Sequence, residues 1–277
     1  MTLRRETRLV RSTHRLENNR RALLLGLAAV LFWSTAATAF KLALADLSVL
    51  QLLAVAITTS ALALIAAAAA QHRLGEVLGL LRREPLYFSA LAALNPLLYY
   101  CILLAAYDRL PAQQAQTINY TWAVTLAVLS IPALGHRLAA RDWLAVLLGY
   151  LGVVIIATEG APLSLEFTSP SGVALALAST VVWAVFWLAS TRSRHDPVVA
   201  LTAGFLCATP PAILLALGLG GGMPAAGTGL LSAVYVGLFE MGFTWLLWSA
   251  DLRSADNVSR VGNLIFLSPL LSLGLIA

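Results

Sequence analysis

Nine long apolar segments follow one another along the chain, separated by short polar connections. Each is about 20 residues long, which is the length an α-helix needs to cross the hydrocarbon core of a bilayer. Such a pattern predicts an all-α membrane protein with nine transmembrane helices. The segments are residues 22–45, 49–70, 86–107, 112–133, 140–158, 171–190, 198–218, 226–249 and 256–277.

Positive charge is distributed unevenly between these segments. Of the 18 Lys and Arg residues, 15 lie in residues 1–21, in the second, fourth, sixth and eighth connections, or within two residues of these connections. Basic residues flank the cytoplasmic side of membrane helices, because they set orientation during insertion. Residues 1–21 are therefore expected to be a basic cytoplasmic leader. The segment after them is too long for the core of a cleavable signal peptide, so it is expected to stay in the mature protein.

Composition excludes other classes of protein. Hydrophobic residues make up 60% of the chain and charged residues 11%, whereas a soluble domain carries roughly 25% charge. The pI of about 9.6 is typical of nucleic-acid-binding domains. Here the arginines flank membrane segments, and contact with anionic lipid headgroups explains them. The expected partners are therefore membrane lipids, with no nucleic acid.

The two halves of the chain resemble each other in order and spacing. Leu31–Thr35 in the first segment matches Val181–Val185 in the sixth, 150 residues later. Leu104–Arg109 at the end of the third segment matches Trp248–Arg253 at the end of the eighth, about 144 residues later. The spacing indicates a repeated unit of five segments.

A unit with an odd number of spans must insert in opposite directions in the two halves, which produces an inverted repeat. The prediction is a ten-helix transporter architecture of two inverted five-helix repeats. The first repeat covers residues 22–159, and the second covers residues 171–277 with spans six to nine only. The tenth span is expected to be missing from this chain, and an intact C-terminus would be cytoplasmic.

Several short motifs accompany this repeat. They are Trp33 and Lys41 in the first segment, Ala105-Ala106-Tyr107 with Leu110-Pro111-Ala112, and Asp142-Trp143 with Gly149 and Gly152-Val153. With these motifs the chain resembles the EamA type of the drug/metabolite transporter superfamily, and it is most similar in character to the exporters of aromatic amino acids. One departure is Gly135-His136-Arg137-Leu138, where the family often has Gly-Glu-Arg-Leu.

The resemblance implies a multi-pass exporter of a bacterial inner membrane that works by alternating access. The implied cargo is aromatic and other neutral amino acids, and the protein is expected to be a monomer or weak oligomer without enzymatic activity. No cofactor is expected, because nothing resembles a nucleotide-binding loop. No metal is expected either, because no two of the four histidines have metal-ligand spacing.

Glu240 is the one acidic residue deep inside an apolar segment. A carboxylate at the centre of a bilayer costs on the order of 3 kcal/mol, so this residue is a functional candidate. It would pair with a cation or the amine of a substrate, or it would couple protons to transport. The structural alternative is a protonated acid that is hydrogen-bonded between helices.

Amide and aromatic side chains complete the candidate site. Spacings of three and four place Asn119 and Tyr120 on the same face of the fourth segment as Gln116, and a spacing of four places Asn95 and Tyr99 on one face of the third. Polar side chains at membrane depth either join helices or line a water-filled path. The candidate substrate-binding residues are Trp33, Asn95, Tyr99, Asn119, Tyr120, Trp122, Trp183, Glu240 and Asn263.

Alternatives to amino-acid export stay open. The nearest is the efflux of cationic drugs or other small metabolites, with Glu240 as the charge partner. An intramembrane enzyme would need a nucleophile, base or metal set at one depth, and the sequence offers none. A scaffold or sensor without transport is a third class. Either proton coupling or passive facilitation fits the sequence. Kinks are predicted at Pro96, Pro132, the pair Pro210-Pro211 and Pro269, because proline removes a backbone hydrogen bond.

Overall fold

The structure, a computed structural model, describes residues 2–134, 140–158, 160, 163, 169–190, 195–247 and 267–276, and these ranges contain helices and no β-strand. The helices are α1 (Thr2–Leu44), α2 (Val49–Ala70), α3 (Leu74–Arg83), α4 (Pro85–Ala92), α5 (Tyr99–Arg109), α6 (Ala112–Asn119), α7 (Trp122–Leu134), α8 (Ala140–Ala157), α9 (Pro170–Ser190), α10 (Pro197–Leu219), α11 (Thr228–Tyr235) and α14 (Leu267–Ile276). Two π-helical segments, η1 (Ala93–Leu98) and η2 (Val236–Gly242), continue α4 and α11.

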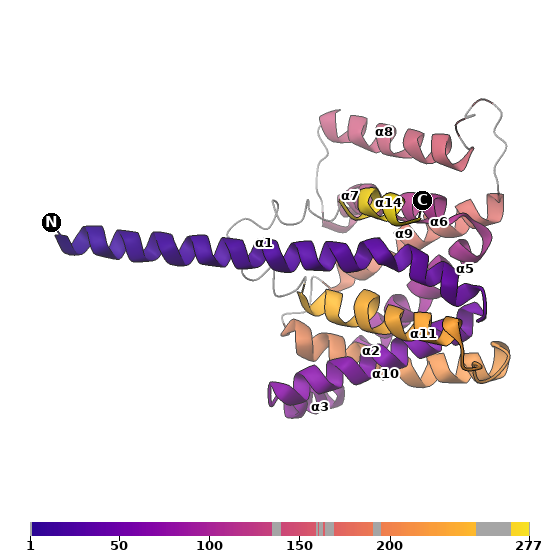
Figure 1. The fold of residues 1–277 in the computed structure, drawn as a ribbon, viewed down its shortest axis with the longest axis horizontal. Coiled ribbons are helices and arrows are strands. Elements are labelled where there is room, and N and C mark those ends of the chain that lie inside the picture. The colour runs from indigo at the N-terminus through magenta and orange to yellow at the C-terminus, as the bar shows by residue number, and fades with distance from the viewer. Residues whose placement is uncertain are drawn as a thin grey trace.

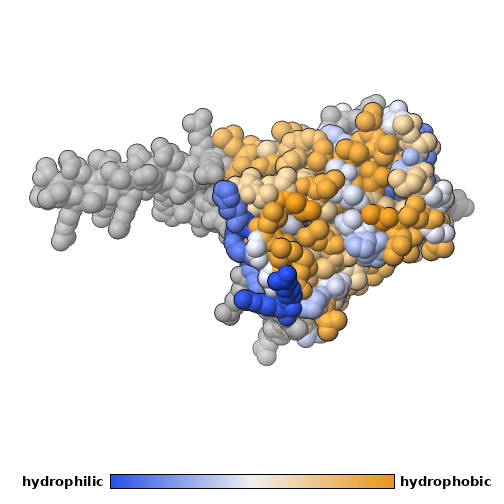
Figure 2. Space-filling model, turned by 90° about the horizontal axis from the view of Figure 1, so that it is seen from below, coloured by the Kyte–Doolittle hydropathy of each residue, from blue (hydrophilic) through white to orange (hydrophobic). Residues whose placement is uncertain are grey.

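Most of these helices lie roughly side by side in a bundle, and α1 extends well beyond it (Figure 1). Within the described residues, six helices are long and apolar enough to cross a membrane. Figure 2 shows a mostly hydrophobic face with hydrophilic side chains gathered toward one end. The prediction of an all-α, multi-pass membrane protein is confirmed. The six helices are Leu23–Leu44, Val49–Ala70, Pro85–Arg109, Pro170–Ser190, Pro197–Leu219 and Thr228–Leu247.

The other three predicted spans have different outcomes. Segment 112–133 is divided into α6 and α7 by a break at Tyr120 and Thr121. Segment 140–158 forms the 18-residue helix α8. Most of segment 256–277 lies outside the described residues, which resume with α14. The count of nine spans therefore stays a prediction.

Helices α2 and α10 form an antiparallel pair. At one end of the pair, the Ser48 hydroxyl donates to the Gly220 carbonyl oxygen at 2.7 Å. At the other end, the Arg73 guanidinium lies 2.9 Å from the Asp196 carboxylate. Ser48 is also the N-cap of α2, and Asp196 is the N-cap of α10. The side-chain oxygen of an N-cap residue accepts a hydrogen bond from a backbone N–H that has no partner inside the helix. The capping residue of each helix is thus joined to the residues that follow the other helix.

These contacts define two ends of the bundle. We call the end with Arg73, α3 and the start of α10 the α3 end. At the opposite end, the Asp46 carboxylate accepts a hydrogen bond of 2.8 Å from the backbone N–H of Gly229, near the start of α11. The Lys41 ammonium donates to the Tyr107 carbonyl oxygen at 2.7 Å, close to the end of α5, where positive charge complements the helix dipole.

Helices α1 and α9 are packed in matching ways. The α1 helix contacts α11, η2 and α14, whereas α9 contacts α5, η1, α6 and α7. In terms of the predicted spans, the first span of each half lies against the third and fourth spans of the other half. Helices from the two halves are therefore interleaved rather than packed as separate bundles.

The π-helical segments also correspond. The shift of 144 residues that aligns the third and eighth predicted spans carries 93–98 onto 237–242, within η2. In η1 the kink predicted at Pro96 is confirmed: Asn95 has non-helical angles of φ −145° and ψ 122°. A residue before proline is pushed out of the helical region, because the proline ring clashes with its backbone. Both segments place irregular backbone near the middle of a span.

Candidate substrate-binding site

Eight aromatic side chains meet in the interior of the bundle, and we call them the aromatic cluster. Trp183 lies at its centre, with its ring 4.6 Å from that of Tyr99 and 5.3 Å from that of Trp245. Trp33 contacts the other side of the cluster, 6.1 Å from Trp245. Trp33 and Trp183 are each only 8% exposed. The cluster consists of Trp33, Tyr99, Tyr100, Trp122, Trp183, Phe186, Trp187 and Trp245.

Two hydrogen-bonded groups connect this cluster to polar residues. The Tyr99 hydroxyl donates to Asn119 Oδ1 at 3.2 Å, and Asn119 Nδ2 donates to the Ser179 hydroxyl at 2.9 Å. The Tyr100 hydroxyl donates to Glu240 Oε1 at 3.1 Å. The second carboxylate oxygen, Glu240 Oε2, is buried and has no hydrogen-bond partner among the described residues. This carboxyl oxygen is therefore a candidate hydrogen-bond acceptor for a ligand.

A pocket of about 310 Å³ lies beside the cluster, and we call it the aromatic pocket. It runs between α4, η1, α9 and α10 from His195, at the α3 end, to Trp187 and Trp245. Its walls are almost entirely apolar or aromatic. Asn95 Oδ1, which belongs to one of the few polar lining residues, is buried without a hydrogen-bond partner among the described residues. The lining residues are Phe88, Leu91, Asn95, Phe186, Trp187, Ser190, His195, Pro197, Ala200, Leu201, Gly204, Phe205 and Trp245.

The structure brings most of the candidate residues together. Four of them, Trp33, Tyr99, Trp122 and Trp183, belong to the aromatic cluster, while Asn119 and Glu240 bind tyrosines of it. Asn95 lines the aromatic pocket.

The remaining two candidates are Tyr120 and Asn263. Tyr120 is half-buried at the break between α6 and α7, and no ring contact joins it to the cluster within the described part of the chain. Asn263 lies outside the described residues. The structure therefore says nothing about the expected role of Asn263.

Other residues of this region were not chosen from the sequence. Phe186 and Trp187 follow Trp183 by three and four positions, a spacing that places all three on one face of α9 and that was a usable signal. Tyr100 is the partner of Glu240, but nothing in the sequence distinguishes it from Tyr99 next to it. Ser179 is the fully buried partner of Asn119 and is one small hydroxyl among many.

An apolar pocket beside an aromatic cluster, with a buried carboxyl group bonded to a tyrosine of that cluster, all inside a bundle of apolar helices, is the arrangement of a membrane transporter for small molecules. The description "EamA-like transporter family" fits residues 20–158 and 170–277 of the chain. The chain belongs to this family, and it is a transporter rather than an enzyme.

Two individual proteins are similar along nearly the whole chain. The aromatic amino acid exporter YddG of Ancylobacter novellus is 27% identical over 254 residues, which cover 91% of this chain and 86% of the exporter. A solved crystal structure superposes with a TM-score of 0.66 at 24% identity, covering 93% of this chain and 88% of its own. The second similarity concerns the fold alone.

Proposed function

We propose that this protein exports aromatic and other neutral amino acids across a bacterial inner membrane by alternating access. The observation that carries the proposal is the aromatic pocket beside Trp183. Its walls suit a flat, partly apolar side chain, because aromatic rings gain energy from stacked and edge-to-face contacts. The name of the relative from A. novellus adds support, since that protein is an exporter of aromatic amino acids.

The polar groups of the site have distinct roles in this proposal. Trp183 and Trp187 contact the ring of the cargo. The free oxygen of Glu240 accepts a hydrogen bond from the ammonium group, as does Asn95 Oδ1. A charge-assisted bond between an ammonium and a buried carboxylate is shorter and stronger than a neutral one. Glu240 thereby selects ligands that carry an amine.

The ten-helix inverted-repeat architecture is part of the proposal, with repeats at residues 22–159 and 171–277. Three observations support it: the equivalent helices α2 and α10 run antiparallel, α1 and α9 have matching neighbours, and the family description matches two separate stretches of the chain. Inverted repeats of this kind place the binding site between the halves.

A second groove supports alternating access. It has a volume of about 410 Å³ and lies between α1 and α11, toward the end opposite α3. The shift of 144 residues carries Phe88 and Leu91 of the aromatic pocket onto Ser232 and Tyr235, which both line this groove. Each opening is lined by helices of both halves, and the two openings lie toward opposite ends.

The orientation in the membrane follows from the basic residues. The α3 end carries Arg73, Arg82 and Arg83, and positive charge accumulates on the cytoplasmic side. We therefore place the N-terminus and the α3 end in the cytoplasm. The aromatic pocket then opens toward the compartment from which an exporter takes its cargo.

Counterflow in proteoliposomes tests the proposed cargo. Liposomes that contain the purified protein are preloaded with unlabelled amino acid and are then given labelled phenylalanine, tryptophan or threonine outside. Transient accumulation of label above that in protein-free liposomes is expected, most strongly for the aromatic pair. If none of the three accumulates, the amino-acid assignment is wrong.

Efflux of cationic drugs is the second candidate, and the free oxygen of Glu240 beside aromatic rings favours it, since cations bind to both groups. Quaternary ammonium compounds would then compete for transport in the wild type and lose this effect in Glu240→Gln. If quaternary ammonium compounds do not compete for transport by the wild type in the same counterflow assay, this candidate is excluded.

A further inference from the structure

A second pocket adjoins the aromatic pocket at the α3 end, and we call it the polar pocket. Its volume is about 380 Å³, and it lies between α3 and the start of α10. His195 lines both pockets, so the two spaces meet at this side chain. The lining residues are Gly75, Glu76, Gly79, Leu80, Arg83, Glu84, His195, Asp196 and Val199.

Glycine on α3 leaves space for this pocket. Gly75 and Gly79 are four positions apart and therefore lie on one face of the helix. A Cβ atom built on either residue would meet no other atom within 4 Å. The face is open because the side chains are missing, and larger residues there would fill the space.

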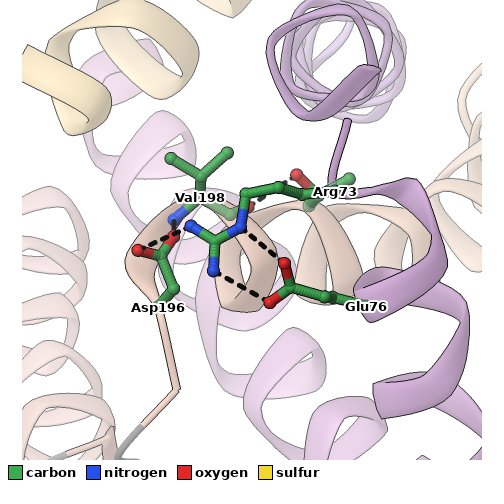
Figure 3. Close-up of polar contacts among 5 residues, drawn as sticks. Arg73, Glu76, Asp196 and Val198 are labelled. Atoms are coloured by element: carbon green, nitrogen blue, oxygen red, sulfur yellow. Dashed lines mark hydrogen bonds and ion pairs between the residues drawn. The ribbon is translucent and has the colours of Figure 1, made fainter. Parts of the chain in front are cut away.

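The acidic groups of the polar pocket are held in place by partners. Figure 3 shows the Arg73 guanidinium between the carboxylates of Glu76 and Asp196. Two hydrogen bonds of 2.8 Å join Arg73 to Glu76, and the hydrogen bond from Arg73 lowers the pKa of the Glu76 carboxyl group. Glu84 Oε1 lies 3.1 Å from His195 Nε2. These carboxylates form a fixed, negatively charged wall.

Arg83 supplies the opposite charge. It is exposed, lines the polar pocket, and has no ion-pair partner among the residues that the structure describes. The pocket thus offers an exposed guanidinium close to several carboxylates. A guanidinium binds a carboxylate group with two parallel hydrogen bonds, while the carboxylates attract an ammonium group.

We propose that the polar pocket is a loading site for the zwitterionic head of an amino acid, which binds there before its side chain enters the aromatic pocket past His195. Arg83 binds the carboxylate of the cargo, and the ammonium group faces Glu84 and Glu76. The inference rests on the proposed export of amino acids and adds a site that is used from the α3 side alone. It is separate from the aromatic cluster and from Glu240.

Entry of labelled tryptophan into inverted membrane vesicles, whose outer surface is the cytoplasmic face, tests the loading site. Arg83→Gln is expected to raise the KM for tryptophan by about two- to fivefold, the range typical of one exposed charge pair. Tryptamine, which lacks the carboxylate, should enter with an unchanged KM. Arg82→Gln is the matched control, because Arg82 is also exposed but does not line the pocket.

A second variant tests the space rather than the charge. Gly79→Leu places a large side chain in the pocket, and its Cβ atom has no neighbour within 4 Å, so it should raise the KM for both compounds from the α3 side. Transport measured from the opposite side should retain its wild-type KM. This asymmetry distinguishes a loading site from a general loss of folded protein, which would lower transport from both sides.

The outcomes separate the two proposals. If wild-type vesicles transport tryptophan and Arg83→Gln behaves like Arg82→Gln, the loading site is wrong and the proposed function stands. An equal effect of Arg83→Gln on tryptophan and tryptamine would likewise refute recognition of the carboxylate. If wild-type vesicles transport no amino acid at all, the proposed function fails, and the loading site fails with it.

Discussion

Replacing Gly237 with alanine tests the close contact between η2 and α2. A Cβ atom at this position would lie 2.6 Å from the Ala56 carbonyl oxygen and 2.7 Å from Thr59 Cβ. Both neighbours are on α2 and cannot move without the helix, so η2 must shift away. Overpacking of this kind costs about 1–3 kcal/mol. The shift also disturbs the 2.6 Å hydrogen bond from Ser60 to the Gly237 carbonyl oxygen, which contributes about 1 kcal/mol.

The matched control is Gly218→Ala in α10, where a Cβ atom would meet nothing within 4 Å. Its effect should stay within about 1 kcal/mol and be stabilising, because alanine is the better helix former. Unfolding in mixed micelles with increasing SDS measures both free energies. Gly237→Ala should also reduce counterflow, because η2 carries Glu240. Equal stability of the two variants would refute the proposed packing of η2 on α2.

Three further predictions follow from single contacts. Trp183→Leu should raise the KM for tryptophan by about tenfold through lost ring contacts, whereas Trp143→Leu on the exposed face of α8 should leave it unchanged; counterflow kinetics measure both. Asp46→Ala should lower the free energy of unfolding by about 1 kcal/mol, because α11 loses a hydrogen-bond acceptor, as SDS titration would show. Arg73 lowers the pKa of the Glu76 carboxyl group in the folded protein. The ionised carboxylate therefore stabilises the fold at pH values above its pKa in the unfolded chain. This stabilisation is lost as the pH falls through its pKa in the folded protein. Thermal unfolding of Glu76→Gln should therefore depend less on pH in the acid range.

The helices were predictable because each apolar segment must satisfy its backbone hydrogen bonds internally in lipid. The correspondence between Trp33 and Trp183 was visible as a shift of 150 residues, and the structure brings both rings onto Trp245. The kink at Asn95 followed from the proline after it. These features depend on local sequence, and a single chain reveals them.

Other features depend on contacts between distant segments. The pairing of Arg73 with Asp196 joins residues 123 positions apart, and the periodicity of neither segment indicates the partner. The break at Tyr120 between α6 and α7 has no proline or glycine to mark it. Glu240 was recognised by its depth in an apolar segment, yet its bond to Tyr100 depends on how η2 and α5 are packed.

Binding of labelled tryptophan to the purified protein tests the central claim most directly, because it examines the cargo and the aromatic cluster together. Saturable binding to the wild type is expected, with competition by phenylalanine, and Trp183→Leu should lose most of it while Trp143→Leu retains it. An absence of binding to the wild type, or equal binding to wild type and Trp183→Leu, would contradict the account.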